Sequence, residues 1–161
     1  MDIDVKVDGL EHIRDVMTRK LPEKSQRKVI LKALRVASKP MLKTAKATVA
    51  KESGALALSL SAWNDNKRKK DTVGTVHIGP KRGNKKAIAV LGAHYGRSFN
   101  LSKIGIYHGH IVEFGTKTQT AKPYLGPAMA AHGQSMIKGF GAIMGKEIEK
   151  EALRLKGKQR K

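Results

Sequence analysis

Residues 23–51 read EKSQRKVILKALRVASKPMLKTAKATVAK. Apolar residues recur there every three or four positions, which places them on one face of a helix: Ile30, Leu34, Ala37, Met41, Ala45 and Val49. Basic residues follow the same spacing on the opposite face: Lys24, Lys28, Lys32, Arg35, Lys39, Lys43 and Lys46. The stretch therefore predicts an amphipathic helix from about Glu23 to Lys51. Pro40 lacks a backbone N–H, so it should kink this helix near Val36 to Ser38.

The basic face of this helix contains no acid between Lys24 and Lys51. Charge runs of this kind are usually solvated surfaces. Glutamates placed four residues from the lysines would relieve the repulsion among like charges, and this helix has none. Their absence favours an acidic partner for the basic face over a merely solvated one.

Shorter elements are predicted on both sides of the long helix. Residues 3–7 alternate apolar and polar side chains as a half-buried strand does, and residues 10–21 have helical spacing. The long helix should end at Ser53 and Gly54. Residues 55–63 fit either a strand or a helical turn, because leucines alternate there with small residues.

The second half of the chain is expected to complete an α+β fold. The predictions are a strand over 73–78, a short apolar strand over 87–91, a loop over 92–103, a further apolar strand over 104–114 and a long helix from Gly126. The resulting single domain, residues 1–155, has a small, mostly antiparallel sheet packed by a long kinked N-terminal helix and a long C-terminal helix. Extended basic loops and a basic tail at 156–161 complete it.

The composition limits the classes of protein. The 161 residues include 33 Lys and Arg, 13 Asp and Glu and no cysteine, with a net charge of +20. No apolar run approaches the roughly 18 residues that span a bilayer, so no membrane contact is expected. The absence of cysteine and of an export signal at the N-terminus predicts an intracellular protein without disulfides. Aromatic residues, at 4%, offer few surfaces for stacking bases.

Two loops beside predicted strands concentrate positive charge. Residues 64–71 contain Lys67, Arg68, Lys69 and Lys70, and residues 81–86 contain Lys81, Arg82, Lys85 and Lys86. Charged loops are usually solvated. A partner for them would be anionic, either nucleic acid or an acidic protein surface.

Catalytic and metal-binding patterns are weak. Between residues 72 and 146 the only carboxylate is Glu113, which is too few for paired acid and base catalysis. His108 and His110 would share a strand face near Glu113, but no third fixed ligand can be identified. Residues 79–86 lack the GxxxxGK[ST] spacing of a phosphate loop. We therefore expect no enzyme, no catalytic residue, no metal and no cofactor.

The stretch HIVEFGT at 110–116, followed by AKPYLGPA at 121–128, resembles the signature of a tail-component family found at the neck of long-tailed phages. Members typically have V-E-[FY]-G-T, a short variable loop, and A-[RK]-P-[FY]-[LM]-x-P-A opening the last helix. The order of the other elements is similar along essentially the whole chain. Gly126 stands where the family often carries Arg, and the segment 81–103 is longer than usual.

The resemblance implies a non-catalytic virion structural protein: a tail-completion, tail-terminator or head-tail joining protein of the phage tail and neck, assembled in the host cytoplasm. It would form a homo-oligomeric ring, expected to be a hexamer, between the head connector or stopper protein and the tail tube or tail terminator protein. Genome DNA in the channel would be a further contact. The implied interface residues are Glu113, Phe114, Gly115, Thr116, Pro123, Tyr124 and Pro127.

A free, sequence-nonspecific nucleic-acid-binding protein is the alternative. The net charge of +20 would neutralise phosphates in such a protein. No helix-turn-helix or zinc-finger pattern favours this alternative.

Glu113 is expected to be structural. A lone carboxylate in an apolar element is costly to bury unpaired, so it should meet an Arg or Lys, or backbone N–H groups, within the domain or in the next subunit. Gly115 permits a turn with positive φ, and Pro127 suits the first turn of the last helix.

Replacing Lys67, Arg68, Lys69 and Lys70 by Ser should reduce head-tail joining more than DNA retention. We expect the arm to contact acidic neighbouring proteins, because a channel that must release DNA quickly gains little from gripping phosphates. Joining and DNA retention, both assayed as functions of salt, measure this. A loss of DNA affinity in the variant would favour the DNA contact instead, if the logarithm of the wild-type binding constant falls with the logarithm of the salt concentration with a slope of about −0.9 per phosphate. No change in either assay would leave only a solvated loop.

Overall fold

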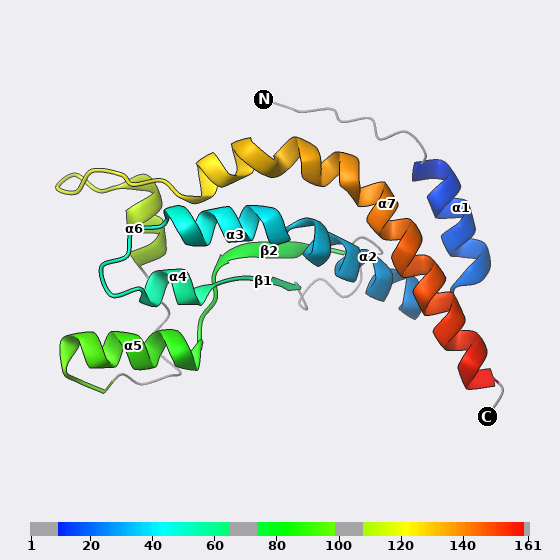
Figure 1. Cartoon of the computed structure of the whole chain (residues 1–161), viewed down its shortest axis with the longest axis horizontal. Coiled ribbons are helices and arrows are strands. Elements are labelled where there is room, and N and C mark those ends of the chain that lie inside the picture. The colour runs from blue at the N-terminus through cyan, green and yellow to red at the C-terminus, as the bar shows by residue number, and fades with distance from the viewer. Residues whose placement is uncertain (1–9, 65–73, 99–107, 160–161) are drawn as a thin grey trace. The chain divides into compact units, whose positions relative to one another are not determined.

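The computed structural model describes residues 10–64, 74–98 and 108–159. The chain divides into two compact units. Unit 1 comprises Met1–Ala37, Asn64–Val76 and Gln134–Lys161, and unit 2 comprises Ser38–Trp63 and His77–Gly133. Figure 1 labels the elements in chain order: α1 (Leu10–Lys20), α2 (Glu23–Ala37), α3 (Lys39–Thr48), α4 (Ala55–Ser59), β1 (Leu60–Asn64), β2 (Val76–Pro80), α5 (Lys85–Tyr95), α6 (His108–Phe114) and α7 (Leu125–Gln159).

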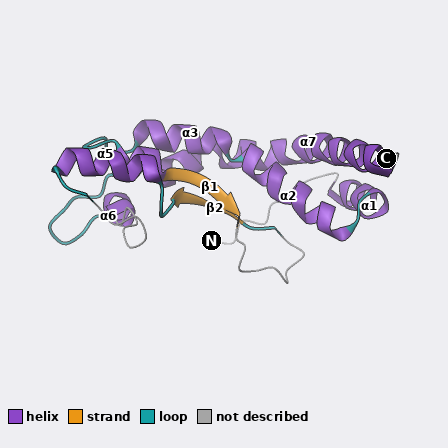
Figure 2. Ribbon diagram, turned by 90° about the horizontal axis from the view of Figure 1, so that it is seen from below, coloured by secondary structure: helices purple, strands orange, loops and turns teal. Residues whose placement is uncertain are grey.

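The predicted α+β class is confirmed: the structure is 70% helical with a small antiparallel sheet, a bent N-terminal helix and a long C-terminal helix. The sheet consists of β1 and β2 (Figure 2). Residues 55–63 contain both alternatives left open by the sequence, because α4 leads directly into β1. The strand predicted over 3–7 lies outside the described residues.

The break in the long N-terminal helix falls where the proline requires it. α2 ends at Ala37 and α3 begins at Lys39, with Pro40 in its first turn. Pro40 has no N–H to donate to the carbonyl four residues earlier, so the hydrogen-bond ladder is interrupted beside Ser38. The predicted end at Ser53 and Gly54 is wrong. α3 already ends at Thr48, and Gly54, with φ of +74°, instead precedes α4.

The strand predicted over 87–91 is wrong, because these residues lie in α5. The side chain of Asn84 starts this helix by accepting a hydrogen bond from the Ala87 N–H at 3.3 Å. Gly96 closes it with φ of +60°. Lys85 and Lys86, predicted in a loop, therefore belong to the first turn of α5.

The strand predicted over 104–114 is also wrong where the structure describes it, since residues 108–114 form α6. Residues two apart on a helix point in widely different directions. The strand face on which the sequence would place residues 108 and 110 together is therefore not formed.

Unit 1 is built on a helical core. Its buried members come from α1, the turn that follows α1, α2 and α7: Met17, Leu21, Val29, Ala33, Met144 and Ile148. Ala33 has no exposed surface, and its small side chain lets α2 approach its neighbours closely. The helical prediction for the chain end is confirmed, and α7 continues to Gln159. The predicted single domain over residues 1–155 and tail over 156–161 stay predictions.

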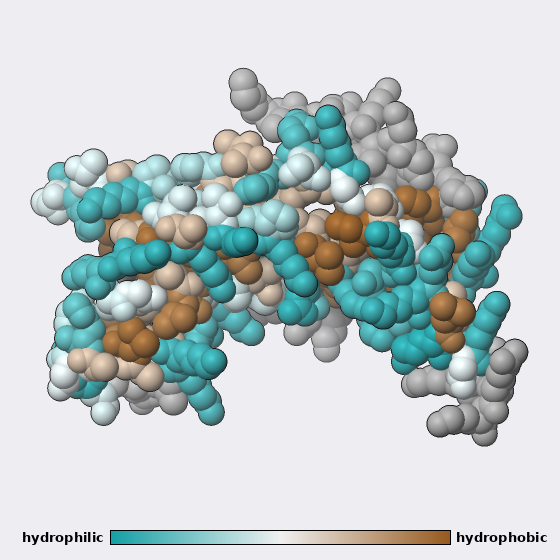
Figure 3. Space-filling model, viewed as in Figure 1, coloured by the Kyte–Doolittle hydropathy of each residue, from teal (hydrophilic) through white to brown (hydrophobic). Residues whose placement is uncertain are grey.

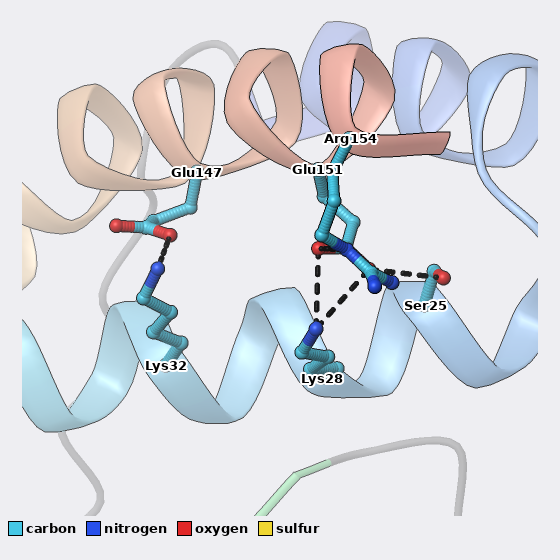
Figure 4. A network of polar contacts seen from close by, with 6 residues as sticks. All are labelled: Ser25, Lys28, Lys32, Glu147, Glu151 and Arg154. Atoms are coloured by element: carbon cyan, nitrogen blue, oxygen red, sulfur yellow. Dashed lines mark hydrogen bonds and ion pairs between the residues drawn. The ribbon is translucent and has the colours of Figure 1, made fainter. Parts of the chain in front are cut away.

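A polar network joins α2 to α7 inside unit 1 (Figure 4). The Glu151 carboxylate, which is 7% exposed, accepts hydrogen bonds from Arg154 Nε at 2.9 Å and from Lys28 Nζ at 3.3 Å. Ser25 Oγ donates to the same carboxylate at 3.3 Å. Lys32 Nζ lies 2.6 Å from a Glu147 carboxylate oxygen. Two lysines of the predicted basic face therefore meet acids of this same chain.

The network fixes the charge of Glu151. The hydrogen bonds from Arg154 and Lys28, with their positive charges, outweigh burial and lower the pKa of Glu151 to about 2. A carboxyl group whose pKa is lower in the folded than in the unfolded protein stabilises the fold above the unfolded pKa. This stabilisation is lost as the pH falls from about 4.5 towards 2.

Glu151→Gln should lower the free energy of unfolding by about 1–2 kcal/mol at neutral pH, since Lys28 and Arg154 are about half exposed and solvent screens the interaction. The difference from wild type should vanish as the pH approaches 2, where the wild-type carboxyl is protonated too. Urea unfolding as a function of pH measures both effects. Glu149→Gln, at an exposed position of the same helix, should change stability by less than about 0.5 kcal/mol. Equal effects of the two substitutions would contradict this role of Glu151.

Candidate functional site

The residues that carry the family resemblance form a compact turn between α6 and α7 in unit 2. Gly115 ends α6 with φ of +73°, and its N–H donates to the Ile111 carbonyl at 2.7 Å. A Cβ at Gly115 would lie 2.8 Å from the backbone atoms Gln119 O and Ala121 N. The positive φ predicted for Gly115 is confirmed, and only glycine fits this position without displacing the backbone.

The loop after Gly115 is held by its own hydrogen bonds. Thr116 Oγ1 accepts from the Gln119 N–H at 3.0 Å, and the Thr116 N–H donates to the Gln119 carbonyl at 2.9 Å. The Lys122 N–H donates to the Val112 carbonyl at 2.7 Å. These bonds return the chain to α6 before α7 begins.

The Glu113 carboxylate receives three backbone N–H groups at the start of α7. Its Oε2 accepts from Tyr124 at 2.8 Å and from Leu125 at 2.9 Å, and its Oε1 accepts from Gly126 at 2.8 Å. We call this arrangement the Glu113 cap. It corresponds to one of the alternatives expected for Glu113, backbone N–H groups within the same chain.

The Glu113 cap accounts for every backbone donor at this helix end. The first four N–H groups of a helix lack partners within it. Here three of the four bond to Glu113, and the fourth residue, Pro127, has no N–H. The predicted place of Pro127 in the first turn is confirmed. A negative charge at a helix N-terminus also interacts favourably with the helix dipole.

The cap fixes the ionisation of two buried groups. Burial alone would raise the pKa of Glu113, but the three backbone hydrogen bonds outweigh it and lower that pKa. Tyr124 has no exposed surface, and its hydroxyl donates to the Gly109 carbonyl at 3.3 Å. Burial, together with the charge of Glu113, raises the pKa of Tyr124 to about 12. Glu113 is therefore ionised and Tyr124 protonated at neutral pH.

The other motif residues lie at the surface of this turn. Phe114 is 80% exposed although it directly follows Glu113. Thr116, Pro123 and Pro127 are also exposed. Tyr124 is the exception, because it lies in the interior. Of the implied interface residues, Phe114 is the one that exposes a large hydrophobic side chain.

Gly109 has a packing role that no sequence pattern indicated. A Cβ at Gly109 would collide with the Pro80 ring and lie 3.1 Å from the Tyr124 hydroxyl. Glycine at this position therefore lets α6 approach both the end of β2 and Tyr124. Its place between two histidines gave no local signal of this packing.

Basic residues dominate unit 2. Its described part contains Glu52 and Glu113 as acids, and Glu113 is engaged in the cap. The basic residues of the same part are Lys39, Lys43, Lys46, Lys51, Lys81, Arg82, Lys85, Lys86, Arg97, Lys117 and Lys122. Of the two predicted basic loops, residues 81–84 form an exposed loop, whereas Lys67, Arg68, Lys69 and Lys70 lie outside the described residues.

Within residues 10–64, 74–98 and 108–159, no three His, Asp or Glu residues gather as metal ligands would. No helix in these ranges is both long and apolar enough to cross a membrane. Comparison with known protein families, curated proteins and solved structures gives no match.

Glu113→Gln should lower the free energy of unfolding by about 2–3 kcal/mol, because an amide accepts through one oxygen and turns an NH₂ towards backbone donors. Since the pKa of Glu113 is lowered in the folded protein, the difference from wild type should shrink as the pH falls below about 4.5. Denaturant unfolding at several pH values measures this.

The exposed Glu52 of the same unit provides the control for this experiment. Glu52→Gln should change stability by less than about 0.5 kcal/mol. A Glu113→Gln protein as stable as wild type at neutral pH would exclude a structural role for the cap.

Proposed function

We propose that this chain is a virion structural protein of the phage neck, a tail-completion or head-tail joining component. It would form a ring between the head connector and the tail tube, as the resemblance at residues 110–128 implies. The observation that carries the proposal is the combination, at those residues, of a rigidly capped turn with the exposed Phe114.

Phe114 has the properties of an interface anchor. Burial of a Phe side chain that is otherwise in water contributes about 1.5–3 kcal/mol, and large side chains often dominate the binding energy of interfaces. Phe114 lies at the end of α6, whose position is fixed by the Glu113 cap and by the Lys122 N–H bond to Val112. A preorganised anchor loses little conformational freedom on binding, which favours assembly.

In this proposal the Glu113 cap acts indirectly. All three hydrogen bonds of the carboxylate are made within the chain, so Glu113 positions the turn rather than contacting the neighbour. The neighbouring subunit would contact Phe114 together with the exposed Pro123 and Pro127. The head connector or stopper protein and the tail tube or tail terminator protein would be the ring's partners in the virion.

Sequence-nonspecific nucleic-acid binding is the second candidate, and the charge of unit 2 favours it. The described part of unit 2 contains many more basic than acidic residues. A surface with such an excess of positive charge attracts phosphates at low salt. The two candidates differ in what they require. A ring component must self-associate, whereas a free nucleic-acid-binding protein need not.

Phe114→Ser should raise the protein concentration needed for half-assembly by about tenfold to a hundredfold, as expected for losing one buried aromatic anchor. Mass photometry over a concentration series, with negative-stain images of the assemblies, measures this. The fold should be unchanged because Phe114 is 80% exposed.

Leu58→Ser is the matched control, since Leu58 is 44% exposed in α4 of the same unit. It should leave assembly within about twofold of wild type. A wild-type chain that stays monomeric, both alone and with head-connector and tail-tube proteins, while binding DNA with a steep salt dependence would replace the ring proposal by the second candidate.

A further inference from the structure

Unit 1 contains an apolar groove that the proposed function does not use. It has a volume of about 960 Å³ and lies between α1 and the last turns of α7, which run side by side (Figures 1 and 2). Ile13 and Val16 line it from α1, and Ile148, Ala152 and Leu155 line it from α7. Leu153, at its edge, is 69% exposed. Figure 3 shows hydrophobic atoms among hydrophilic ones over this part of unit 1.

The lining has the form of a binding surface for a third helix. Residues three and four apart share one helix face, and the lining residues of both helices follow this spacing: Ile13 and Val16 on α1, and Ile148, Ala152 and Leu155 on α7. A groove between two such apolar stripes is the surface on which an amphipathic helix lays its own apolar face. The exposed Leu153 offers that helix a further hydrophobic contact.

The charges around the groove indicate which kind of helix would bind there. Glu147 and Glu151 of α7 pair with lysines of α2, as Figure 4 shows, so they do not offset the basic residues around the groove. The groove itself is lined by two basic residues and one acid: Lys20, Lys156 and Glu149. Arg154 of α7 pairs with Glu151. Four other exposed basic residues directly follow or precede lining residues in the sequence, Arg14, Arg19, Lys146 and Lys150, and the exposed acid Asp15 lies among them. The surroundings of the groove are therefore positive.

We propose that this groove binds an acidic amphipathic helix of a partner protein. A second copy of this chain fits less well, because its charge is +20 and its α1 and α7 would bring further basic residues to a basic rim. The groove belongs to unit 1 and the Glu113 cap to unit 2, so the proposal does not depend on ring formation.

A synthetic peptide tests the proposal. The probe is a fluorescein-labelled helix of about 18 residues, with Leu at positions i, i+3, i+4 and i+7 and Glu at most others. Two further peptides are needed: one with Lys in place of Glu, and one with the same composition as the probe in scrambled order. The scrambled peptide distinguishes binding in the groove from nonspecific attraction of an acidic peptide to a basic protein. Fluorescence anisotropy with the full chain should show the probe binding at least about tenfold tighter than both.

Leu153→Glu should weaken binding of the probe by at least about tenfold, since it removes an apolar contact and repels the acidic peptide. Leu58→Glu introduces the same change at the exposed leucine of unit 2 and should have an effect below about twofold. Circular dichroism checks that both variants keep the wild-type helix content.

Reversing the charge of the rim provides an independent variant. Lys20→Glu combined with Lys156→Glu should weaken binding of the acidic probe and strengthen binding of the Lys peptide. Both side chains are exposed, so the fold should tolerate the change.

Three outcomes would overturn the proposal: equal binding of the probe and the scrambled peptide, unchanged binding by the Leu153→Glu protein, or a wild-type dimer that Leu153→Glu converts to monomer. The last outcome would assign the groove to a second copy of this chain. Assembly measured with Phe114→Ser is a separate readout, so failure of the ring proposal and failure of this one can be distinguished.

Discussion

The start of α7 imposes the constraint on which unit 2 depends. A helix that begins against a buried tyrosine must find acceptors for its first N–H groups, and at this end one carboxylate supplies all of them. The same bonds join the end of α6 to the start of α7 and so define the loop between them. α7 then continues into unit 1, where Glu147 and Glu151 hold it to α2. Each unit is thus tied to α7 through carboxylates.

The buried carboxylates stand out in a chain that has 33 Lys and Arg against 13 Asp and Glu. Glu113 and Glu151 are the buried acids of the described chain, and both are engaged by donors of the same unit. Few acids remain to offset a large excess of lysine and arginine. Like charges left on a surface repel one another and favour anionic partners. Glu113 bonds to backbone N–H groups, so its charge pairs with no lysine or arginine of the described chain.

The elements with long, regular patterns could be predicted from the sequence, and the short ones only in part: the strand predicted over 73–78 overlaps β2, whereas α5 and α6 were predicted as strands. The N-terminal helices and their break at Pro40 followed from spacing and from a missing N–H. α5 and α6 were misassigned because short apolar runs fit a strand or a helix equally well. Asn84 was the available sign of a helix start, but its amide also donates to the Leu58 carbonyl, 26 residues away. That contact exists only in the folded chain.

The candidate site shows the same division. That a lone Glu113 would be satisfied structurally followed from the cost of burying an unpaired charge. Which donors satisfy it depends on the return of the loop to α6, and no local pattern specifies this. Likewise, Lys28 and Glu151 are separated by 123 residues, so their pairing could not be foreseen from the spacing of the basic face. A sequence pattern indicates that a buried charged group needs a partner, whereas the tertiary fold determines which residue becomes that partner.

The protonation states of the buried groups bear on the kind of function. A general acid or base works best when its pKa lies near the operating pH. Here the pKa of Glu113 and of Glu151 is lowered, and that of Tyr124 is raised to about 12, so all three are displaced away from neutrality. Groups held in this way keep one charge state and one set of hydrogen bonds under physiological conditions. Glu113 therefore keeps the charge that its three backbone hydrogen bonds at the start of α7 require.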